Sequence, residues 1–126
     1  PMLLLATASF WEGVDVPGEA LELVVIARLP FASPADPLVA ARLRQLESDN
    51  RNPFMEYQVP LASLALKQGF GRLIRTRDDE GVVALLDRRA WTMGYGKVFL
   101  RSLPPCTILR TQDELRDWWG ELDGLI

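Results

Sequence analysis

The sequence has 126 residues, of which 48% are hydrophobic and 25% charged, so it fits about one ordinary globular domain. One cysteine and no histidine exclude an intrachain disulfide, a Ser-His catalytic triad and a local zinc site of Cys and His ligands. No apolar run approaches the roughly eighteen residues of a membrane-spanning helix, and the first residues lack the basic start of a signal peptide. These features predict a cytoplasmic protein with no membrane partner.

The net charge of −3 is unevenly placed along the chain. Residues 104–126 carry Arg110 and Arg116 against five acidic residues, which accounts for the whole acidic excess. Residues 60–101, in contrast, carry eight Lys and Arg side chains against four Asp and Glu. A polyanion would therefore be bound through this middle stretch, and the overall acidity does not exclude nucleic acid as a partner.

Taken in chain order, the first elements are strands. Residues 2–7 are apolar on both faces, which is typical of a buried parallel strand, and a polar loop follows over residues 9–18. Residues 21–29 predict a second strand because they are rich in β-branched side chains. Ligands of such sheets bind beyond the carboxyl ends of the strands, so the loop that follows the first strand is expected on the functional edge.

Two helices are expected next. Asp36 is placed to cap a helix that begins at Pro37 and runs to about Asp49. A loop over residues 50–53 then leads to a second helix over residues 61–76, with Pro60 in its first turn, where the missing N–H is not needed.

The C-terminal part continues the alternation. Residues 81–87 predict a third strand, residues 94–103 a helix, and residues 106–110 a fourth, weaker strand. Thr111 and Glu114 form a capping box, T-x-x-E, that opens a last helix. Its core-facing side would carry Leu115, Trp118, Trp119 and Leu122. Strands that alternate with helices predict a single α/β domain with a mostly parallel sheet.

The helix over residues 61–76 presents a polar stripe. At about 100° per residue, Gln68, Arg72 and Arg75 share one narrow face. The opposite face is apolar and carries Leu66, Phe70, Leu73 and Ile74. Gly69 and Gly71 flank the stripe, although each weakens a helix by about 1 kcal/mol relative to alanine. One Gln and two Arg beside bare backbone suit an anion such as a triphosphate, while a surface helix with solvated arginines fits the spacing equally well.

Four segments in order resemble one family, the DinG/XPD branch of the superfamily 2 helicases. Residues 68–75 (QGFGRLIR) are similar to motif VI, and residues 9–18 (SFWEGVDVPG) to motif V. Residues 29–37 resemble the LPF…DP segment, and residues 87–104 the DxR…YGK…LP signature. Four matches in this order are far more specific than any single one.

The resemblance implies an N-terminally truncated RecA-like fold: residues 1–126 would be the C-terminal portion of the second motor domain, whose opening strand–helix units lie upstream. The first RecA-like domain of the same protein would bind ATP and Mg²⁺. Arg75 and Arg72 would reach across the cleft to the γ-phosphate, and Gln68 would orient the water or the phosphate. Family members can also carry an iron–sulfur cluster on four cysteines of the first motor domain, and this chain has only Cys106.

The resemblance also assigns roles to the loop over residues 9–18. Asp15 would meet the ribose of the nucleotide or couple the ATP state to movement, and Glu12 and Gly71 would lie on the same nucleotide side. Ser9 and the backbone around Gly13 would contact the phosphates of single-stranded DNA. The alternative is a capped turn whose two acids only satisfy backbone N–H groups.

The basic residues after the third predicted strand have two interpretations. Arg88 and Lys97, together with Arg89 and Arg101, would line a DNA path, and a solvated basic face explains them equally well. Residues 93–98 (MGYGKV) are not a Walker A loop, because they lack its first glycine and its Ser or Thr. Without a phosphate loop or an acidic Mg²⁺ motif, and with no metal ligands assigned, the chain alone is predicted to be inactive.

Two functions are therefore kept. The first is a motor domain that supplies an arginine finger and a DNA-coupling loop for ATP hydrolysis and 5′–3′ translocation on single-stranded DNA. The second is a catalytically silent nucleic-acid-binding or interaction module with the same fold. If the upstream strand–helix units are absent, an open sheet edge is a template for pairing, so residues 1–126 alone are also expected to self-associate.

Overall fold

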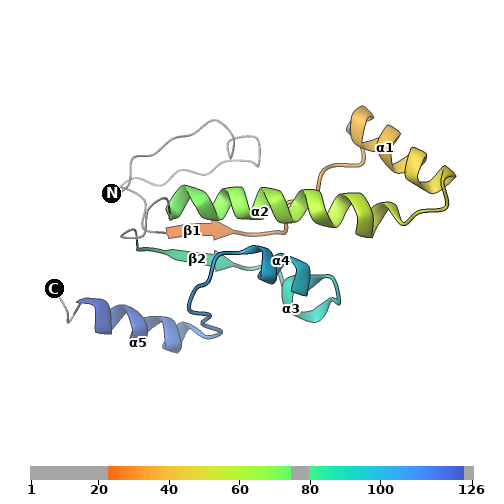
Figure 1. Cartoon of the computed structure of the whole chain (residues 1–126). Coiled ribbons are helices and arrows are strands. Elements are labelled where there is room, and N and C mark those ends of the chain that lie inside the picture. The colour runs from red at the N-terminus through yellow and green to blue at the C-terminus, as the bar shows by residue number, and fades with distance from the viewer. Residues whose placement is uncertain (1–22, 75–79, 124–126) are drawn as a thin grey trace.

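The computed structural model describes residues 23–74 and 80–123 (Figure 1). The strand expected over residues 2–7 and the loop over residues 9–18 lie outside these described residues, and so do five candidate site residues: Ser9, Glu12, Gly13, Asp15 and Arg75. The roles expected of them stay predictions.

Two parallel strands form the sheet that the described residues contain. Strand β1 (Leu23–Ile26) pairs with β2 (Val82–Leu85), in the register Leu23 to Val82 through Ile26 to Leu85. Parallel neighbours need a crossover connection, and helices provide it here (Figure 1). The predicted parallel α/β fold is confirmed, but both strands end earlier than expected. Beyond the ends of the strands, the Leu29 N–H donates to the side chain of Asp87, at Oδ2, over 2.8 Å. Leu29 and Asp87 therefore make this contact instead of the backbone hydrogen bonds of a sheet.

Helix α1 (Pro37–Ser48) begins and ends where the sequence predicts. Asp36 Oδ1 accepts hydrogen bonds from the backbone N–H groups of Leu38, at 2.8 Å, and Val39, at 3.3 Å. This side-chain cap satisfies donors that a helix start leaves without partners. The helix projects from the rest of the molecule (Figure 1).

The long helix of the crossover, α2 (Val59–Leu73), is preceded directly by a π-helical segment, η3 (Phe54–Gln58). The Val59 N–H donates to the Phe54 carbonyl, five residues back. The expected loop is therefore confined to residues 50–52. Pro60 lies in the first turn of α2, as predicted, although the π-helical turn of η3 directly precedes that turn. A proline ring clashes with the carbonyl four residues before it in a regular helix, and the wider π turn ahead of Pro60 fits that constraint.

Helix α2 covers one face of the sheet and builds the core. Its Val59, Ala62 and Leu66 are at most 1% exposed. They belong to one apolar cluster whose other buried members are Ile26, Leu29, Ala90 and Phe99. The predicted apolar face is confirmed at Leu66 and Phe70, whereas Leu23 and Val25 of β1 are 52% and 55% exposed.

After β2 the chain forms two short helices, where the sequence predicted only one over residues 94–103. Helix α3 (Arg89–Thr92) was not predicted, and α4 (Gly96–Ser102) follows it. The two helices approach closely, because a Cβ atom on Gly96 would collide with the carbonyl oxygen of Ala90. The strand predicted over residues 106–110 is wrong. All of its side chains except the half-buried Leu109 are exposed, so little apolar burial holds this segment in a sheet.

Helix α5 (Gln112–Asp123) opens with the predicted capping box. The Glu114 N–H donates to Thr111 Oγ1 at 3.1 Å, and Glu114 Oε2 accepts from the N–H of Thr111, at 3.3 Å, and of Arg110, at 2.7 Å. Trp118 is half-buried, but Trp119 is 36% exposed and lies against Trp118 instead of the core. None of the helices in the described ranges is long and apolar enough to cross a membrane.

Candidate functional site

The exposed face of α2 carries Gln68 and Arg72, two of the three predicted anion-binding side chains. The helix was expected to run to residue 76, but it ends at Leu73 and the backbone of Ile74 is extended, so the prediction of a continuous helical stripe is wrong beyond Leu73. Gln68 is exposed and Arg72 is half-buried. They are four residues apart, so they are neighbours on the helix surface. Leu66 and Phe70, on the other side of the helix, are 1% and 8% exposed. An amide and a guanidinium thus lie side by side on an apolar support, a combination that can hold and orient a phosphate.

The two glycines of this helix differ in what surrounds them. Gly71 is exposed, and a Cβ atom added there would meet none of the described residues within 4 Å. Its backbone is therefore open to a ligand beside Arg72. Gly69 is buried, so the expectation that both glycines present bare backbone beside the stripe is wrong for Gly69.

The stripe and the basic residues after β2 lie at opposite ends of the sheet. Helix α2 runs against the direction of the strands, so Gln68 and Arg72 lie toward the amino ends of β1 and β2 (Figure 1). Arg88 and Lys97 are exposed and follow the carboxyl end of β2, at the starts of α3 and α4. The structure therefore does not bring the predicted nucleotide-side residues of α2 together with these predicted DNA contacts.

Asp87 is the most heavily bonded side chain at the carboxyl end of the sheet. It is 8% exposed and accepts from the backbone N–H groups of Leu29, at 2.8 Å, and Arg89, at 3.0 Å. The Arg89 guanidinium adds a two-pronged contact, with Nη2 2.6 Å from Oδ2 and Nε 3.0 Å from Oδ1. The Arg89 side-chain bonds, followed by the backbone bonds, hold the pKa of Asp87 well below its usual range despite burial. The same contact raises the pKa of Arg89.

An aromatic cluster surrounds this ion pair. The Arg89 guanidinium carbon lies 5.4 Å from the centre of the Phe31 ring. Phe31, Phe54, Tyr95 and Phe99 have ring centres between 5.0 and 6.3 Å apart in five pairs. The LPF segment and the DxR and YGK signatures thus meet in one network. Arg89 is part of that network, which gives it a structural role, and its place in a DNA path stays a prediction.

Sequence reasoning missed this network. Asp87 and Leu29 are 58 positions apart, and no local pattern pairs them. The one available signal was that a carboxylate directly follows an apolar strand that is expected to be buried. Such a group must find donors when it is covered.

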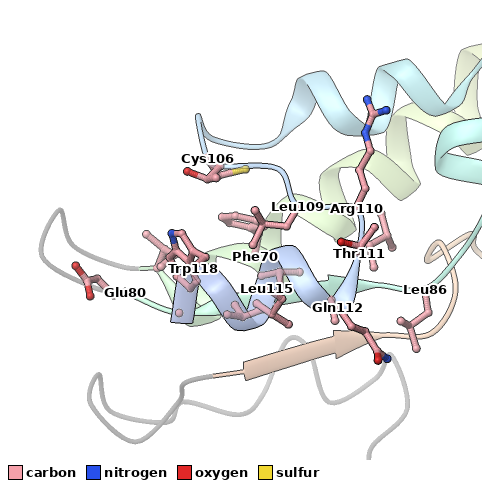
Figure 2. A pocket seen from close by; sticks show the side chains of 17 residues that line it. Phe70, Glu80, Leu86, Cys106, Leu109, Arg110, Thr111, Gln112, Leu115 and Trp118 are labelled. Atoms are coloured by element: carbon pink, nitrogen blue, oxygen red, sulfur yellow. The ribbon is translucent and has the colours of Figure 1, made fainter. Parts of the chain in front are cut away.

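A pocket of about 470 Å³ lies between β2, the end of α2 and the segment that leads into α5. Figure 2 shows Phe70, Leu115 and Trp118 pointing into it, with Cys106 and Glu80 at its rim. Its lining is mainly apolar, and Glu80 is the one carboxylate among the described residues that line it. Residues 23–74 and 80–123 also contain no group of three or more side chains that could hold a metal ion. The part of the pocket that the structure describes therefore shows no acid–base pair and no metal site.

Comparison with known proteins defines the class of this domain. Residues 1–106 match the family described as helicase C-terminal domain, which covers most of the chain. The chain belongs to this family, and its fold is RecA-like. The expected resemblance is thereby confirmed.

The curated relatives narrow the class to DinG-type proteins. The chain is 53% identical to the ATP-dependent DNA helicase YoaA of Escherichia coli K12, over 90% of this chain and 18% of the relative. It is 46% identical to the 3′-5′ exonuclease DinG of Bacillus subtilis 168, over 88% of this chain and 12% of the relative. It is 50% identical to the ATP-dependent helicase DinG of Mycobacterium tuberculosis H37Rv, over 81% of this chain and 15% of the relative. The chain thus spans less than a fifth of the length of these relatives.

Proposed function

We propose that this chain is part of the second motor domain of a DinG-type ATP-dependent DNA helicase and supplies half of a composite ATP site. Relatives named as ATP-dependent DNA helicases at about half identity support the class of activity. The observation that carries the site is the pair Gln68 and Arg72, side by side on α2 next to the open backbone of Gly71. Arg75 follows Arg72 by three positions in the same sequence motif.

In this proposal the chain stabilises the negative charge that develops on the γ-phosphate during hydrolysis, and the first motor domain binds the rest of the nucleotide. Arg75 acts as the arginine finger on the γ-phosphate, Arg72 supports it, and Gln68 orients the attacking water or the phosphate. Gly71 lets the phosphates approach the helix backbone. Mg²⁺ neutralises phosphate charge when it is bound, and we assign its ligands to the first motor domain, because the described residues contain no cluster of acids for it. An iron–sulfur cluster on four cysteines would likewise need residues outside this chain.

The loop over residues 9–18 converts the ATP state into movement. We assign Asp15 and Glu12 to the nucleotide side, and Ser9 and Gly13 to the phosphates of single-stranded DNA. Closure and opening of the cleft between the motor domains would then advance the protein 5′ to 3′ along the strand. Arg88 and Lys97 lie at the far end of the sheet from the α2 stripe, so they belong to a separate contact with DNA.

The test is ATP turnover by the full-length protein in the presence of single-stranded DNA. Arg75→Ala should lower the turnover number by roughly 10³ or more while ATP affinity stays within about tenfold, which is the usual effect of losing an arginine finger. Arg75→Lys should restore little, because an ammonium group cannot reproduce the guanidinium fork. Arg44→Ala, at an exposed position of α1, is the matched control and should turn over normally.

Three outcomes would contradict the proposal. Near-normal turnover by Arg75→Ala would exclude Arg75 as the finger. ATP hydrolysis by residues 1–126 alone, abolished by the same substitution, would exclude a composite site. A full-length protein that binds DNA but never hydrolyses ATP would favour the silent nucleic-acid-binding module.

A further inference from the structure

A strongly basic stretch stands out from the acidic chain. Residues 88–110 contain five Lys and Arg side chains and no Asp or Glu, although the whole chain has 17 acidic and 14 basic residues. Arg89 is paired with Asp87. The other four cations of this stretch are exposed: Arg88, Lys97, Arg101 and Arg110.

An exposed aromatic ring lies within this basic stretch of the sequence. Trp91 of α3 is 47% exposed. The guanidinium carbon of Arg110 lies 5.6 Å from the centre of its indole ring, and Figure 2 shows the Arg110 side chain extending away from the neighbouring pocket. Trp91 and Arg110 also line a groove of about 550 Å³ together with Leu100 and Leu103 of α4. Arg88 precedes Trp91 by three residues, which places it on the same side of α3.

Nothing in the core requires this arrangement. A tryptophan whose purpose was packing would bury its ring, as Phe99 does nearby with 0% exposure. The arginine held against the ring carries a charge that remains in contact with water. An exposed indole with a guanidinium on it is a combination that proteins use to bind single strands. The one acid that contacts Arg110, Glu114, accepts from its backbone N–H at 2.7 Å and not from its guanidinium in the hydrogen bonds of the described residues.

We propose that Trp91 and Arg110 form a stacking platform for a base of single-stranded DNA. The base stacks on the indole ring, and Arg110 and Arg88 contact the phosphates on either side. This inference rests on the proposed function, because it takes DNA as the ligand. Charge complementarity decides the occupant: a polyanion uses Arg110 and Arg88 beside the ring, whereas an apolar peptide in the groove would leave them without a role. In this proposal the platform binds DNA, and the contacts with ATP stay with the residues of α2 and of the loop over residues 9–18.

The experiment measures the affinity of the full-length protein for a fluorescent oligo(dT) by anisotropy at one fixed salt concentration. Trp91→Ala should weaken binding by roughly 5- to 150-fold, the range for loss of one stacked base, and Trp91→Phe should keep most of the affinity. Arg88→Ala should reduce the slope of log affinity against log salt by about one, as expected for one lost phosphate contact. Trp119→Ala removes another exposed tryptophan, 36% exposed against 47% for Trp91, from acidic α5 and should bind normally.

The outcomes separate this inference from the function on which it rests. Unchanged affinity in a folded Trp91→Ala variant, with melting temperature near that of the parent, overturns the platform. Equal losses in the Phe and Ala variants also overturn it, because a stacking site accepts any aromatic ring. If the parent protein binds DNA through Trp91 but shows no DNA-stimulated ATP turnover, the platform stands and the motor proposal fails.

Discussion

At the scale of single residues, Asp87 shows how one carboxylate joins distant segments. It is 8% exposed and bonds the backbone of Leu29 and both the backbone and the side chain of Arg89. The anion is therefore the form that the fold stabilises. The ends of the two strands, the LPF segment and the start of α3 all depend on this one group.

We expect Asp87→Asn to lower the free energy of unfolding of this region by about 1–3 kcal/mol at neutral pH, the scale for lost hydrogen bonds to a charged group. The pKa of Asp87 is depressed in the folded state, so its stabilisation is complete above the unfolded value of about 3.9 and is lost as the pH falls below it. Hydrogen exchange of the peptide that contains Leu29, measured in the full-length protein, reports this region directly. If the difference in exchange protection between Asp87→Asn and the parent protein is the same at pH 2.5 and pH 7, the charge of Asp87 is not responsible for the stabilisation.

Ser63 is a second residue whose surroundings give a prediction. It lies on α2 at 6% exposure, and its Oγ has no hydrogen-bond partner in the structure as far as residues 23–74 and 80–123 describe it. A buried hydroxyl without a partner keeps its cost of desolvation. Ser63→Ala should therefore raise the stability by about 1 kcal/mol, seen as a higher melting temperature.

Ser48→Ala is the matched control, because Ser48 is exposed and its hydroxyl donates to the Gln45 carbonyl at 2.8 Å. That change should be neutral or slightly destabilising. A lower melting temperature for Ser63→Ala would show that the full-length protein gives this hydroxyl a partner.

At the scale of elements, short sequence patterns predict the helix caps and the apolar helix face correctly. They do not predict the features that depend on contacts between distant segments. The caps at Asp36 and Thr111 were predictable, because donor and acceptor lie within three residues of each other. The apolar face of α2 followed from its period. The π turn of η3, the early ends of β1 and β2, and the helix α3 depend on contacts between segments far apart in the sequence.

The candidate site likewise has one part that the sequence predicts and another that depends on the fold. The pairing of Gln68 with Arg72 follows from helical spacing alone, so the sequence predicted it. That these residues lie at the opposite end of the sheet from Arg88 and Lys97 depends on the direction of α2 against the strands, which no short motif encodes. Trp91 was overlooked because its meaning comes from Arg110, nineteen positions away, and from exposure.

The contact between α3 and α4 yields the prediction that belongs to this scale. A Cβ on Gly96 would collide with the backbone of Ala90, whereas a Cβ on Gly94 would meet nothing within 4 Å. Gly96→Ala should therefore destabilise the protein by about 1–3 kcal/mol, the usual cost of overpacking, and Gly94→Ala should not. Thermal melting of the two variants makes the comparison. Equal melting temperatures would show that α3 and α4 separate without cost.

At the scale of the whole molecule, one face of the sheet has less cover than a parallel sheet normally has. Helix α2 covers one side, but Leu23 and Val25 of β1 are 52% and 55% exposed. Parallel sheets are covered on both faces in α/β proteins. Because the relatives are more than five times longer than the matched region, there is ample chain in such proteins to cover this face.

We expect residues 1–126, prepared alone, to associate through this apolar face, because large exposed apolar patches drive contact between copies. Light scattering coupled to size-exclusion chromatography over a hundredfold range of concentration should show a mass that rises above 14.2 kDa. Val25→Lys should shift the chain toward the monomer, because a charge on the exposed face of β1 opposes its burial. Leu38→Lys places the same charge on α1, at a side chain that is 82% exposed and distant from the sheet, and should leave association unchanged. A 14.2 kDa monomer at every concentration would mean that the chain covers the exposed face of β1 by itself.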